Sequence, residues 1–407
     1  MFQRLNRRQF VNFSAGAAAG IGFFQHVPSV FAETAREVDN QEKILVVVQL
    51  SGGNDGLNTV VPFADELYYK NRFTLAIGKN AARKINDEVG FHPSLDGFAK
   101  LIESNQLSVI QGVGYPNPNR SHFESMDLWH TAHQTDARIP EGWLGKLLTS
   151  NKTGADQIPA IHFGQEKQPL ALASATKAFP SIRSIERFRL NAARDRELKK
   201  LIESNVAQQR ETGNELLDFV QTTADSAIKA GDRVEEVLKK KKSTANYPGS
   251  RLAEKLKTIA RMIHAEMPTT VYYVTHDGFD THANQAEAHA GLLSQLGDAV
   301  NAFMEDLTEQ GNEKRVLLMS FSEFGRRVRQ NASQGTDHGT AGPMFLAGGA
   351  VKSGVIGKHP RLDDLDQGDL KFHTDYRQVY ATILEKWFGV SGNKILGGKY
   401  KPLELFG

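Results

Sequence analysis

Three short clusters of acidic residues and histidines carry side chains that suit metal binding. They lie at 277–282, 322–326 and 337–339, each at or just beyond the end of an apolar run. In an open α/β sheet, ligands bind outside the carboxyl ends of the strands. If the apolar runs are strands of one sheet, the clusters reach a common edge, where their oxygen and nitrogen ligands would converge. The sequence therefore predicts a metal site with one or two ions.

The candidate ligands follow from side-chain type and spacing. Asp280 and His282 stand two apart, so in an extended loop both project to one side and can reach a single ion. Glu323 comes directly after another apolar run. Asp337 and His338 form a pair flanked by glycines, in which the carboxylate either binds metal or orients the imidazole.

Asp55 is a further candidate ligand, in the stretch Gly52-Gly53-Asn54-Asp55 that follows the first apolar run. The glycines permit tight turns there. The Asp55 carboxylate would either bind metal at the sheet edge or close an Asx turn or helix cap. Taken with the later clusters, the metal-ligand interpretation is favoured.

Ser121 is the candidate nucleophile, because it lies where a helix is expected to begin and a bound metal ion would activate its hydroxyl. The alternative is a helix-capping serine with Glu124 as its capping-box partner. Arg120 is positioned to grip an anion. Arg326 is expected either to bind an anionic substrate or to neutralise the surrounding carboxylates.

The absence of cysteine removes thiolate ligands, disulfides and cysteine nucleophiles. Histidines with carboxylates allow zinc, manganese, calcium or magnesium. The cofactor prediction is therefore one or more divalent metal ions.

The apolar runs alternate with amphipathic stretches, which predicts a doubly wound α/β fold with a mostly parallel sheet. Asp375 is expected first of all to cap a helix over 376–388. The expected strands are 43–50, 107–113, 160–163, 270–275, 315–321 and 343–348, and the expected helices include 93–105, 121–133 and 284–310.

Residues 184–266 depart from this pattern, because they are charged, poor in glycine and proline, and helically periodic. We predict two or three helices inserted into a single α/β domain that spans 33–407. The lysines at 239–242 fit a solvated helix end better than a nucleic-acid contact.

Residues 1–32 have the features of a twin-arginine signal peptide, with Arg7-Arg8 before a weakly apolar, Ala/Gly-rich segment. This predicts export of the folded protein to the periplasm or the extracellular space; retention of the segment as a membrane anchor and a buried N-terminal helix are the alternatives. Removing its three arginines changes the formal net charge from +2 to about −1, so no nucleic-acid partner is expected. No run in the mature chain is apolar and long enough to span a bilayer.

Several of these motifs together resemble an exported bacterial family, domain of unknown function 1501. The resemblance covers essentially the whole mature chain and, more distantly, extends to the alkaline phosphatase and sulfatase superfamily. It implies an alkaline-phosphatase-like fold in which Asp55, Asp280, His282, Glu323 and His338 hold metal and Ser121 attacks. The motifs that carry it are 50–58, 115–123, 278–282, 322–326 and 337–340.

The resemblance implies a hydrolase of a small-molecule or polymeric phosphate or related oxyanion ester. Glu323-Phe324 stands where the superfamily usually has Asp-His, and no Cys or Ser is followed by x-Pro-x-Arg, so a formylglycine sulfatase is not expected. The alternative is a non-catalytic, metal-containing binding protein of the cell envelope. An exported protein partner is a further expectation from relatives of the family.

Overall fold

A nine-stranded sheet forms the centre of the part of the chain that the computed structural model describes, namely residues 43–133, 141–150, 158–182, 236, 243 and 245–407. The strand order is β11-β5-β10-β9-β1-β8-β6-β7, and β14 also pairs with β5. Only β10 runs against the other strands of this sheet. The strands are β1 (Ile44–Ser51), β5 (Leu107–Gly114), β6 (Ala160–Phe163), β7 (Ser181–Ile182), β8 (Val271–Asp277), β9 (Val316–Ser322), β10 (Gly342–Ala347), β11 (Gly354–Ile356) and β14 (Thr374–Asp375).

Strand β1 shows why this sequence forms a buried strand. It is paired on both sides, with β8 and β9, and is apolar at almost every position. Val46 and Val48 face one hydrophobic core, while Leu45 and Val47 face the other. A strand covered on both faces needs apolar side chains at successive positions.

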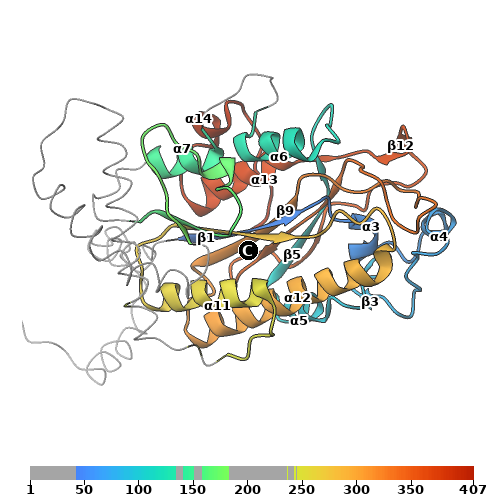
Figure 1. Cartoon of the computed structure of the whole chain (residues 1–407), viewed down its shortest axis with the longest axis horizontal. Helices are drawn as coiled ribbons and strands as arrows, with labels where there is room; N and C mark the ends of the chain where they lie inside the picture. Colours follow the sequence, from blue (N-terminus) through green and yellow to red (C-terminus); the bar gives the residue numbers. More distant parts are fainter. Residues whose placement is uncertain (1–42, 134–140, 151–157, 183–235, 237–242, 244) are drawn as a thin grey trace, which may run out of the picture. The chain divides into compact units, whose positions relative to one another are not determined.

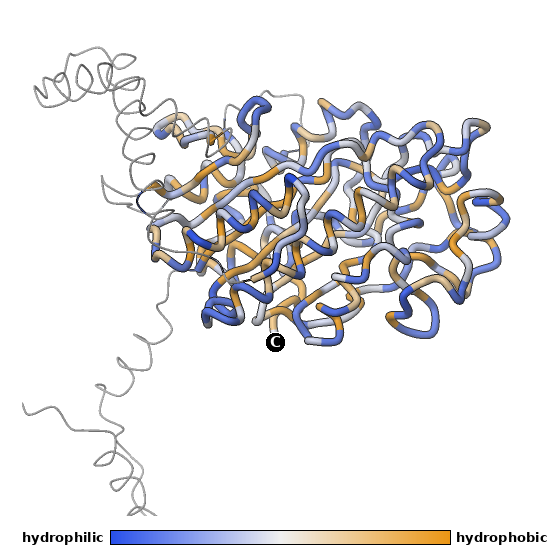
Figure 2. The backbone as a smooth tube through the Cα atoms, turned by 60° about the horizontal axis from the view of Figure 1, so that its bottom comes forward, coloured by the Kyte–Doolittle hydropathy of each residue, from blue (hydrophilic) through white to orange (hydrophobic). Residues whose placement is uncertain are grey.

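Helices cover both faces of the sheet (Figure 1). On one face lie α5 (Asp96–Glu103), α11 (Arg251–His264) and α12 (Gln285–Glu309), whose apolar sides join the first core. On the other lie α6 (His122–Thr131), α7 (Trp143–Ser150), α13 (Tyr376–Thr382) and α14 (Gly392–Leu396). The tube in Figure 2 alternates between apolar and polar colours along the helices, as expected for elements with one buried side.

Shorter elements complete the described residues. A third hydrophobic cluster, which includes Leu57, Phe63 and Val328, packs several of the loops together. The shorter helices are α3 (Gly56–Thr59), α4 (Glu66–Asn71), η1 (Leu170–Leu172) and the π-helical η2 (Ile383–Trp387). One small sheet consists of β2 (Val60–Val61), β3 (Arg83–Lys84) and β4 (Gly90–Phe91), and another consists of β12 (Leu365–Asp366) and β13 (Asp369–Leu370).

The predicted α/β class with a mostly parallel sheet is confirmed, and each of the six expected strands is present. Asp375 caps α13 through a capping box with Gln378. Most of the predicted insertion at 184–266 lies outside the described residues, whereas its last part is α11, which packs on the sheet. The signal at 1–32 also lies outside them. None of the described helices is long and apolar enough to cross a membrane.

A buried ion pair ties the loop after β1 to the rest of the fold. The side chains of Asp55 and Arg72 are fully inaccessible, and Arg72 Nη2 donates to Asp55 Oδ1 over 2.8 Å. Arg72 also donates to the carbonyls of Arg327 and Val328, and Gln285 Nε2 donates to Asp55 Oδ2. One carboxylate thus connects the loop after β1 with the start of α12, and its arginine reaches the loop after β9.

We predict that Asp55→Asn strongly destabilises the protein. The substitution leaves the guanidinium of Arg72 buried without its countercharge, which costs about 3–5 kcal/mol. Urea unfolding of the two proteins would measure the change. Glu66→Gln is the matched control, because Glu66 pairs with Lys70 on the surface with 90% of its side chain exposed, and it should leave the midpoint unchanged. Equal midpoints for native and Asp55→Asn proteins would contradict the assigned role.

The same pair predicts a contribution to acid sensitivity. Burial favours the neutral carboxyl, but the charge and hydrogen bonds of Arg72 outweigh it and lower the pKa of Asp55 from 3.8 to about 2. The unfolded chain therefore binds more protons between these values, so the stabilisation is present above about pH 4 and is lost as the pH falls through about 2. Unfolding free energies measured from pH 5 to 2 should fall less steeply for Asp55→Asn than for the native protein.

Candidate metal centre

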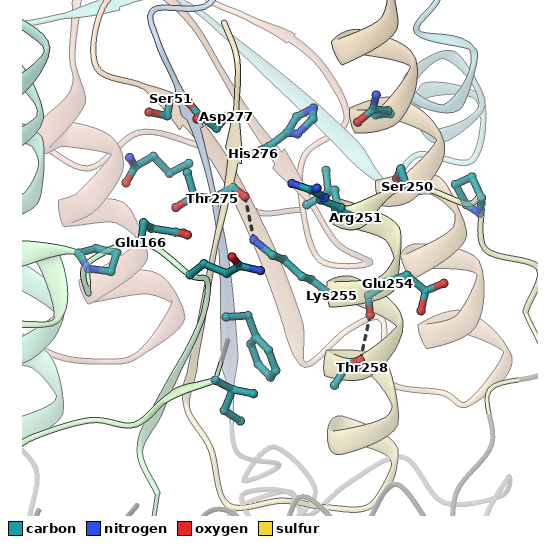
Figure 3. A pocket seen from close by; sticks show the side chains of 18 of the residues that line it. Ser51, Glu166, Ser250, Arg251, Glu254, Lys255, Thr258, Thr275, His276 and Asp277 are labelled. Atoms are coloured by element: carbon teal, nitrogen blue, oxygen red, sulfur yellow. Dashed lines mark hydrogen bonds between the residues drawn. The ribbon is translucent and has the colours of Figure 1, made fainter. Parts of the chain in front are cut away.

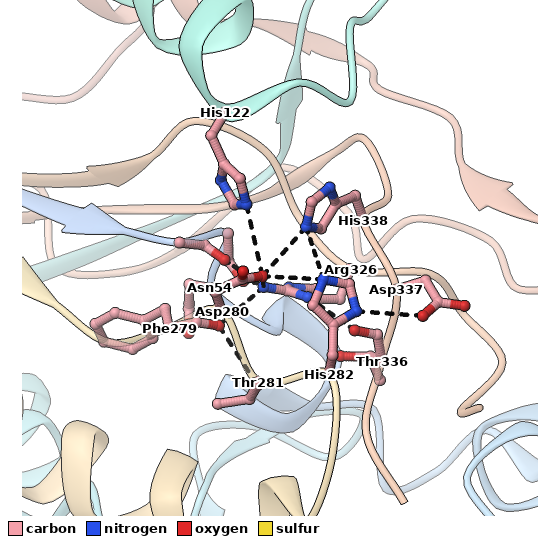
Figure 4. Close-up of polar contacts among 12 residues, drawn as sticks. Asn54, His122, Phe279, Asp280, Thr281, His282, Arg326, Thr336, Asp337 and His338 are labelled. Carbon is pink, nitrogen blue, oxygen red and sulfur yellow. Dashed lines mark hydrogen bonds and ion pairs between the residues drawn. The ribbon is translucent and has the colours of Figure 1, made fainter. Parts of the chain in front are cut away.

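Three parts of the chain bring four metal-type side chains together (Figure 4). His122 is the first residue of α6. Asp280 and His282 lie in the loop after β8, and His338 lies in the loop between β9 and β10. The grouping arises because β5, β8 and β9 run in the same direction, so the segments that follow them reach one edge of the sheet.

The imidazoles of this cluster direct their Nε2 atoms toward one carboxylate oxygen. Asp280 Oδ1 lies 3.1 Å from Nε2 of His282, 3.1 Å from Nε2 of His338 and 3.5 Å from Nε2 of His122. The Nε2 atoms of His282 and His338 are only 2.9 Å apart. Ligand atoms of His122, Asp280 and His338 all lie within 4.8 Å of one another, a spacing compatible with one shared ion.

Each imidazole is held by its other ring nitrogen. His122 Nδ1 lies 2.8 Å from Glu323 Oε1, and His282 Nδ1 lies 3.3 Å from Asp337 Oδ1. His338 Nδ1 lies 2.9 Å from the carbonyl oxygen of Arg120. Because these partners can only accept, each Nδ1 carries the proton, and each Nε2 keeps a lone pair for metal. Protein-bound metal ions commonly have histidine ligands fixed in this way.

His122 provides a separate test of whether a metal ion fits. Its Nε2 is buried and has no hydrogen-bond partner among the described residues. A buried, unsatisfied polar atom costs free energy, and a metal ion would supply the missing partner. The residues present therefore fit a divalent ion.

Electrostatics keep Asp280 ready as an anionic ligand. Burial favours its neutral form, but the hydrogen bond and the positive charge of Arg326, together with the contact to His338, outweigh burial and lower the pKa of Asp280 to about 2. The hydrogen bond to Glu323 raises the pKa of His122, whereas burial lowers the pKa of His338. A metal ion would compete with protons for these Nε2 atoms.

Arg326 holds the loops around the cluster. Its side chain is fully buried, and its Nη2 donates to Asp280 Oδ1 at 2.7 Å. This contact fits the interpretation in which Arg326 neutralises a carboxylate. Its Nε, Nη1 and Nη2 atoms also donate to backbone carbonyls in three loops, and the enclosed guanidinium has no exposed face for a substrate anion. These carbonyls belong to Gly52, Gly53, Phe279 and Thr336.

Gly52 and Gly53 are required by the close approach of these loops. Both have positive φ, at 115° and 75°. A Cβ on Gly52 would lie 2.4 Å from the backbone nitrogen of Asp280, and one on Gly53 would lie 2.4 Å from the ring of Phe324. Any larger residue would push Asp280 or Phe324 away.

Two of the predicted ligands take other positions in the structure. Glu323 is buried, and its Oε1 accepts from His122 and from the backbone N–H of Gly52, so it orients a ligand from behind. Asp337 likewise accepts from His282 and from Asn331. Asp337 thus orients the imidazole of His282. It does not orient the imidazole of its sequence neighbour His338.

Asp55 is not a member of this cluster, and its role as a metal ligand stays a prediction. Both of its oxygens accept hydrogen bonds from Arg72 or Gln285. The prediction treated a carboxylate at a strand exit as free. In the structure, a distant arginine from the end of α4 occupies it.

Ser121 and Arg120 flank the cluster. Ser121 precedes α6 but makes no side-chain cap to it, so the capping-box alternative is not observed. Glu124 accepts instead from Asn119. The guanidinium of Arg120 pairs with the buried carboxylate of Asp369, and its role in binding an anion beside Ser121 stays a prediction.

His122 was not among the predicted ligands. The signal that would have found it is its place at the first position of a helix that follows a strand, next to the candidate nucleophile. The pairing with Glu323, 201 residues away, is not visible in sequence.

The family comparison matches residues 42–396 to a model described as "Protein of unknown function (DUF1501)". No curated protein matches the sequence. Solved structures with a distantly similar arrangement include three bacterial proteins. The PsFucS1 sulfatase from Pseudoalteromonas sp. is 13% identical over 92% of this chain and 74% of that chain, with a TM-score of 0.41. A protein in the alkaline phosphatase superfamily from Vibrio parahaemolyticus is 6% identical over 79% of this chain and 64% of that chain, with a TM-score of 0.37. The phosphonate monoester hydrolase SpPMH from Silicibacter pomeroyi is 9% identical over 89% of this chain and 76% of that chain, with a TM-score of 0.38.

We predict that His122→Ala and His338→Ala each abolish stoichiometric metal binding, because each removes an Nε2 ligand. Glu323→Gln should weaken binding about 10–100-fold, since it disturbs the partner that orients His122. Elemental analysis and competition with a metal-sensitive dye would measure both effects. His373→Ala and Glu305→Gln, at exposed residues outside the cluster, are the controls. Native-like affinity in His122→Ala would exclude this residue as a ligand.

Proposed function

Because this chain belongs to the DUF1501 family, whose function is unknown, we propose a function from the geometry of its metal centre. The protein is a metal-dependent hydrolase of a phosphate or related oxyanion ester, built around one divalent ion. The observation that carries this proposal is the convergence of three Nε2 atoms on Asp280 Oδ1, with that of His122 buried and unpartnered.

His122, Asp280 and His338 would hold the ion, and His282 is the fourth nearby ligand. Imidazole nitrogens suit zinc and other transition metals, whereas calcium and magnesium prefer oxygen ligands. Of the four metals the sequence allows, zinc and manganese therefore fit this ligand set better.

The centre is open to solvent on one side. The side chains of Asp280 and His282 are 49% and 44% exposed, whereas that of Glu323, behind His122, is 1% exposed. Catalytic metal sites keep an accessible position of this kind, and structural sites are closed. A bound ion would supply Lewis acidity and would lower the pKa of a nearby hydroxyl.

Ser121 is the proposed nucleophile. Its hydroxyl is not used to cap α6, and it is covalently adjacent to the ligand His122. In the proposed reaction, Ser121 Oγ loses its proton and forms a bond to the phosphorus, the ester P–O bond breaks, and the leaving alkoxide takes up a proton. Water then forms a bond to the phosphorus, the bond from the phosphorus to Ser121 Oγ breaks, and one proton of the water returns to the serine oxygen. The first N–H groups of α6 would favour the negative charge near Ser121, since Arg120 and Arg326 are already paired.

Export is part of the same proposal. The twin-arginine signal predicted at 1–32 would carry the folded chain, with its ion already bound, to the periplasm or beyond. A site made of side chains from three distant segments would form only after folding, which suits a route that transports folded proteins.

A second candidate function is a non-catalytic binding protein of the cell envelope, with the ion in a structural role. It is favoured by the positions of Asp55 and Glu323, which leave one His/Asp cluster among the described residues where a two-ion enzyme would need two. Metal content alone does not separate the two functions, so turnover decides between them.

We predict that the purified mature protein with one equivalent of zinc or manganese hydrolyses p-nitrophenyl phosphate, and that a chelator stops the reaction. Ser121→Ala should lower kcat at least about 100-fold if the hydroxyl attacks, because the remaining groups act only by binding and polarising the ester. Release of p-nitrophenol measures the rate. Ser104→Ala, at the end of α5, should leave it unchanged.

Two results would reverse this assignment. Full activity in Ser121→Ala with metal bound would remove Ser121 as the nucleophile. No turnover of phosphate, phosphonate or sulfate aryl esters by metal-loaded protein would support the binding function instead.

A further inference from the structure

A large pocket lies at the carboxyl ends of β1, β6 and β8, beside the N-terminal half of α11 (Figure 3). Its volume is about 1260 Å³. Pockets for small ligands usually measure about 300–1,000 Å³, so this one has room for an oligomer of several units. None of its lining residues is a metal ligand proposed above.

The pocket adjoins the metal centre through the ends of two strands. Ser51 and Asp277, which both line it, are partners in the β1–β8 register. The carbonyl oxygen of Ser51 accepts a 3.0 Å hydrogen bond from the backbone N–H of Phe279, the residue before Asp280. A ligand in the pocket would therefore lie along the edge that carries the cluster.

Amides and hydroxyls form much of the lining. These groups both donate and accept hydrogen bonds, as sugar hydroxyls do, and therefore suit a polyhydroxylated ligand. Phe163, Ile182 and Leu252 add apolar surface for the C–H faces of sugar rings. The amide and hydroxyl residues include Gln49, Ser51, Gln165, Ser250, Ser294 and Gln295.

Lys255 is the cation set most deeply in this lining. Its ammonium group donates to the carbonyl oxygen of Thr275 at 3.1 Å, as Figure 3 shows. An ammonium group has three donors, so a ligand oxygen would find further N–H groups there. Arg251, one helical turn earlier on α11, also lines the pocket and adds a second positive charge.

The acidic residues of the lining limit how much charge a ligand can carry. Glu166 is held by His162 Nε2 at 3.3 Å, and the carboxylates of Glu254, Asp277 and Asp298 also face this space. A densely charged polyanion would be repelled by them. A ligand with about one anionic group per sugar unit could place it on Lys255 and keep its hydroxyls near the carboxylates.

We propose that this pocket binds an acidic oligosaccharide of the uronate type, with one ligand carboxylate on Lys255 and Arg251. The inference deepens the proposed function, on which it rests, by naming the class of molecule that carries the ester. The sugar chain occupies the pocket, and the ester reaches the metal centre past Ser51 and Asp277.

The test is calorimetric titration of the purified mature protein with tetragalacturonate, with neutral maltotetraose and with a heparin tetrasaccharide. Tetragalacturonate should bind at least about tenfold more tightly than either of the others. Lys255→Met and Arg251→Met should each weaken its binding, with the larger loss, at least about tenfold, for Lys255→Met. Lys257→Met is the matched control, because Lys257 is on α11 but lies over the ring of Tyr247 outside the pocket lining, and it should bind as the native protein does.

Equal binding of tetragalacturonate and maltotetraose, tighter binding of the heparin fragment, or native affinity in both Lys255→Met and Arg251→Met would overturn the proposal. If Lys255→Met does not fold, Arg251→Met at an exposed residue decides the question. Binding is measured without turnover, so a lack of hydrolysis with intact binding overturns only the proposed function. Hydrolysis of aryl esters without oligosaccharide binding overturns only this inference.

Discussion

The hydrogen bonds of the buried Arg326 guanidinium are the interaction on which the His/Asp cluster depends. The guanidinium reaches the loop after β1 through Gly52 and Gly53, the loop after β8 through Phe279 and Asp280, and its own loop through Thr336. A buried charged side chain costs free energy unless it is paired and hydrogen-bonded. Three loops must therefore be in place before the charge can be buried, and the same condition brings the ligands together.

Around Arg326, the acidic residues divide into those that face the cluster and those that stand behind it. Asp280 faces the cluster and remains partly exposed, whereas Glu323 is fully enclosed and accepts from the back of His122. Because Glu323 is buried, few water molecules compete for its hydrogen bond with the His122 imidazole, and that bond is stronger as a result. The exposed position of Asp280 keeps its oxygens accessible to an ion and its ligands.

The layered fold was predictable because apolar runs such as 43–50 are long, buried on both faces and separated by periodic helices. His282, Asp280 and His338 were predictable for a related reason: residues that follow parallel strands meet at one edge. Which carboxylate joins the histidine cluster was not predictable. Asp55 and Glu323 occupy similar places in sequence to Asp280, and only their partners Arg72 and His122, from other parts of the chain, decide their roles. The direction of β10 was likewise not apparent, since an apolar run has no polarity.

That reversed strand affects how the site could change in evolution. Because β10 runs antiparallel beside β9, residues 323–341 leave one edge of the sheet and return to it, and their two arms pair through Gly325, Arg326, His338 and Thr340. The segment is thus a loop that starts and ends at the same edge of the sheet. Insertions or deletions toward its tip would reshape the mouth of the site while the strands and helices keep their register, so related chains could acquire new specificities by altering this loop alone.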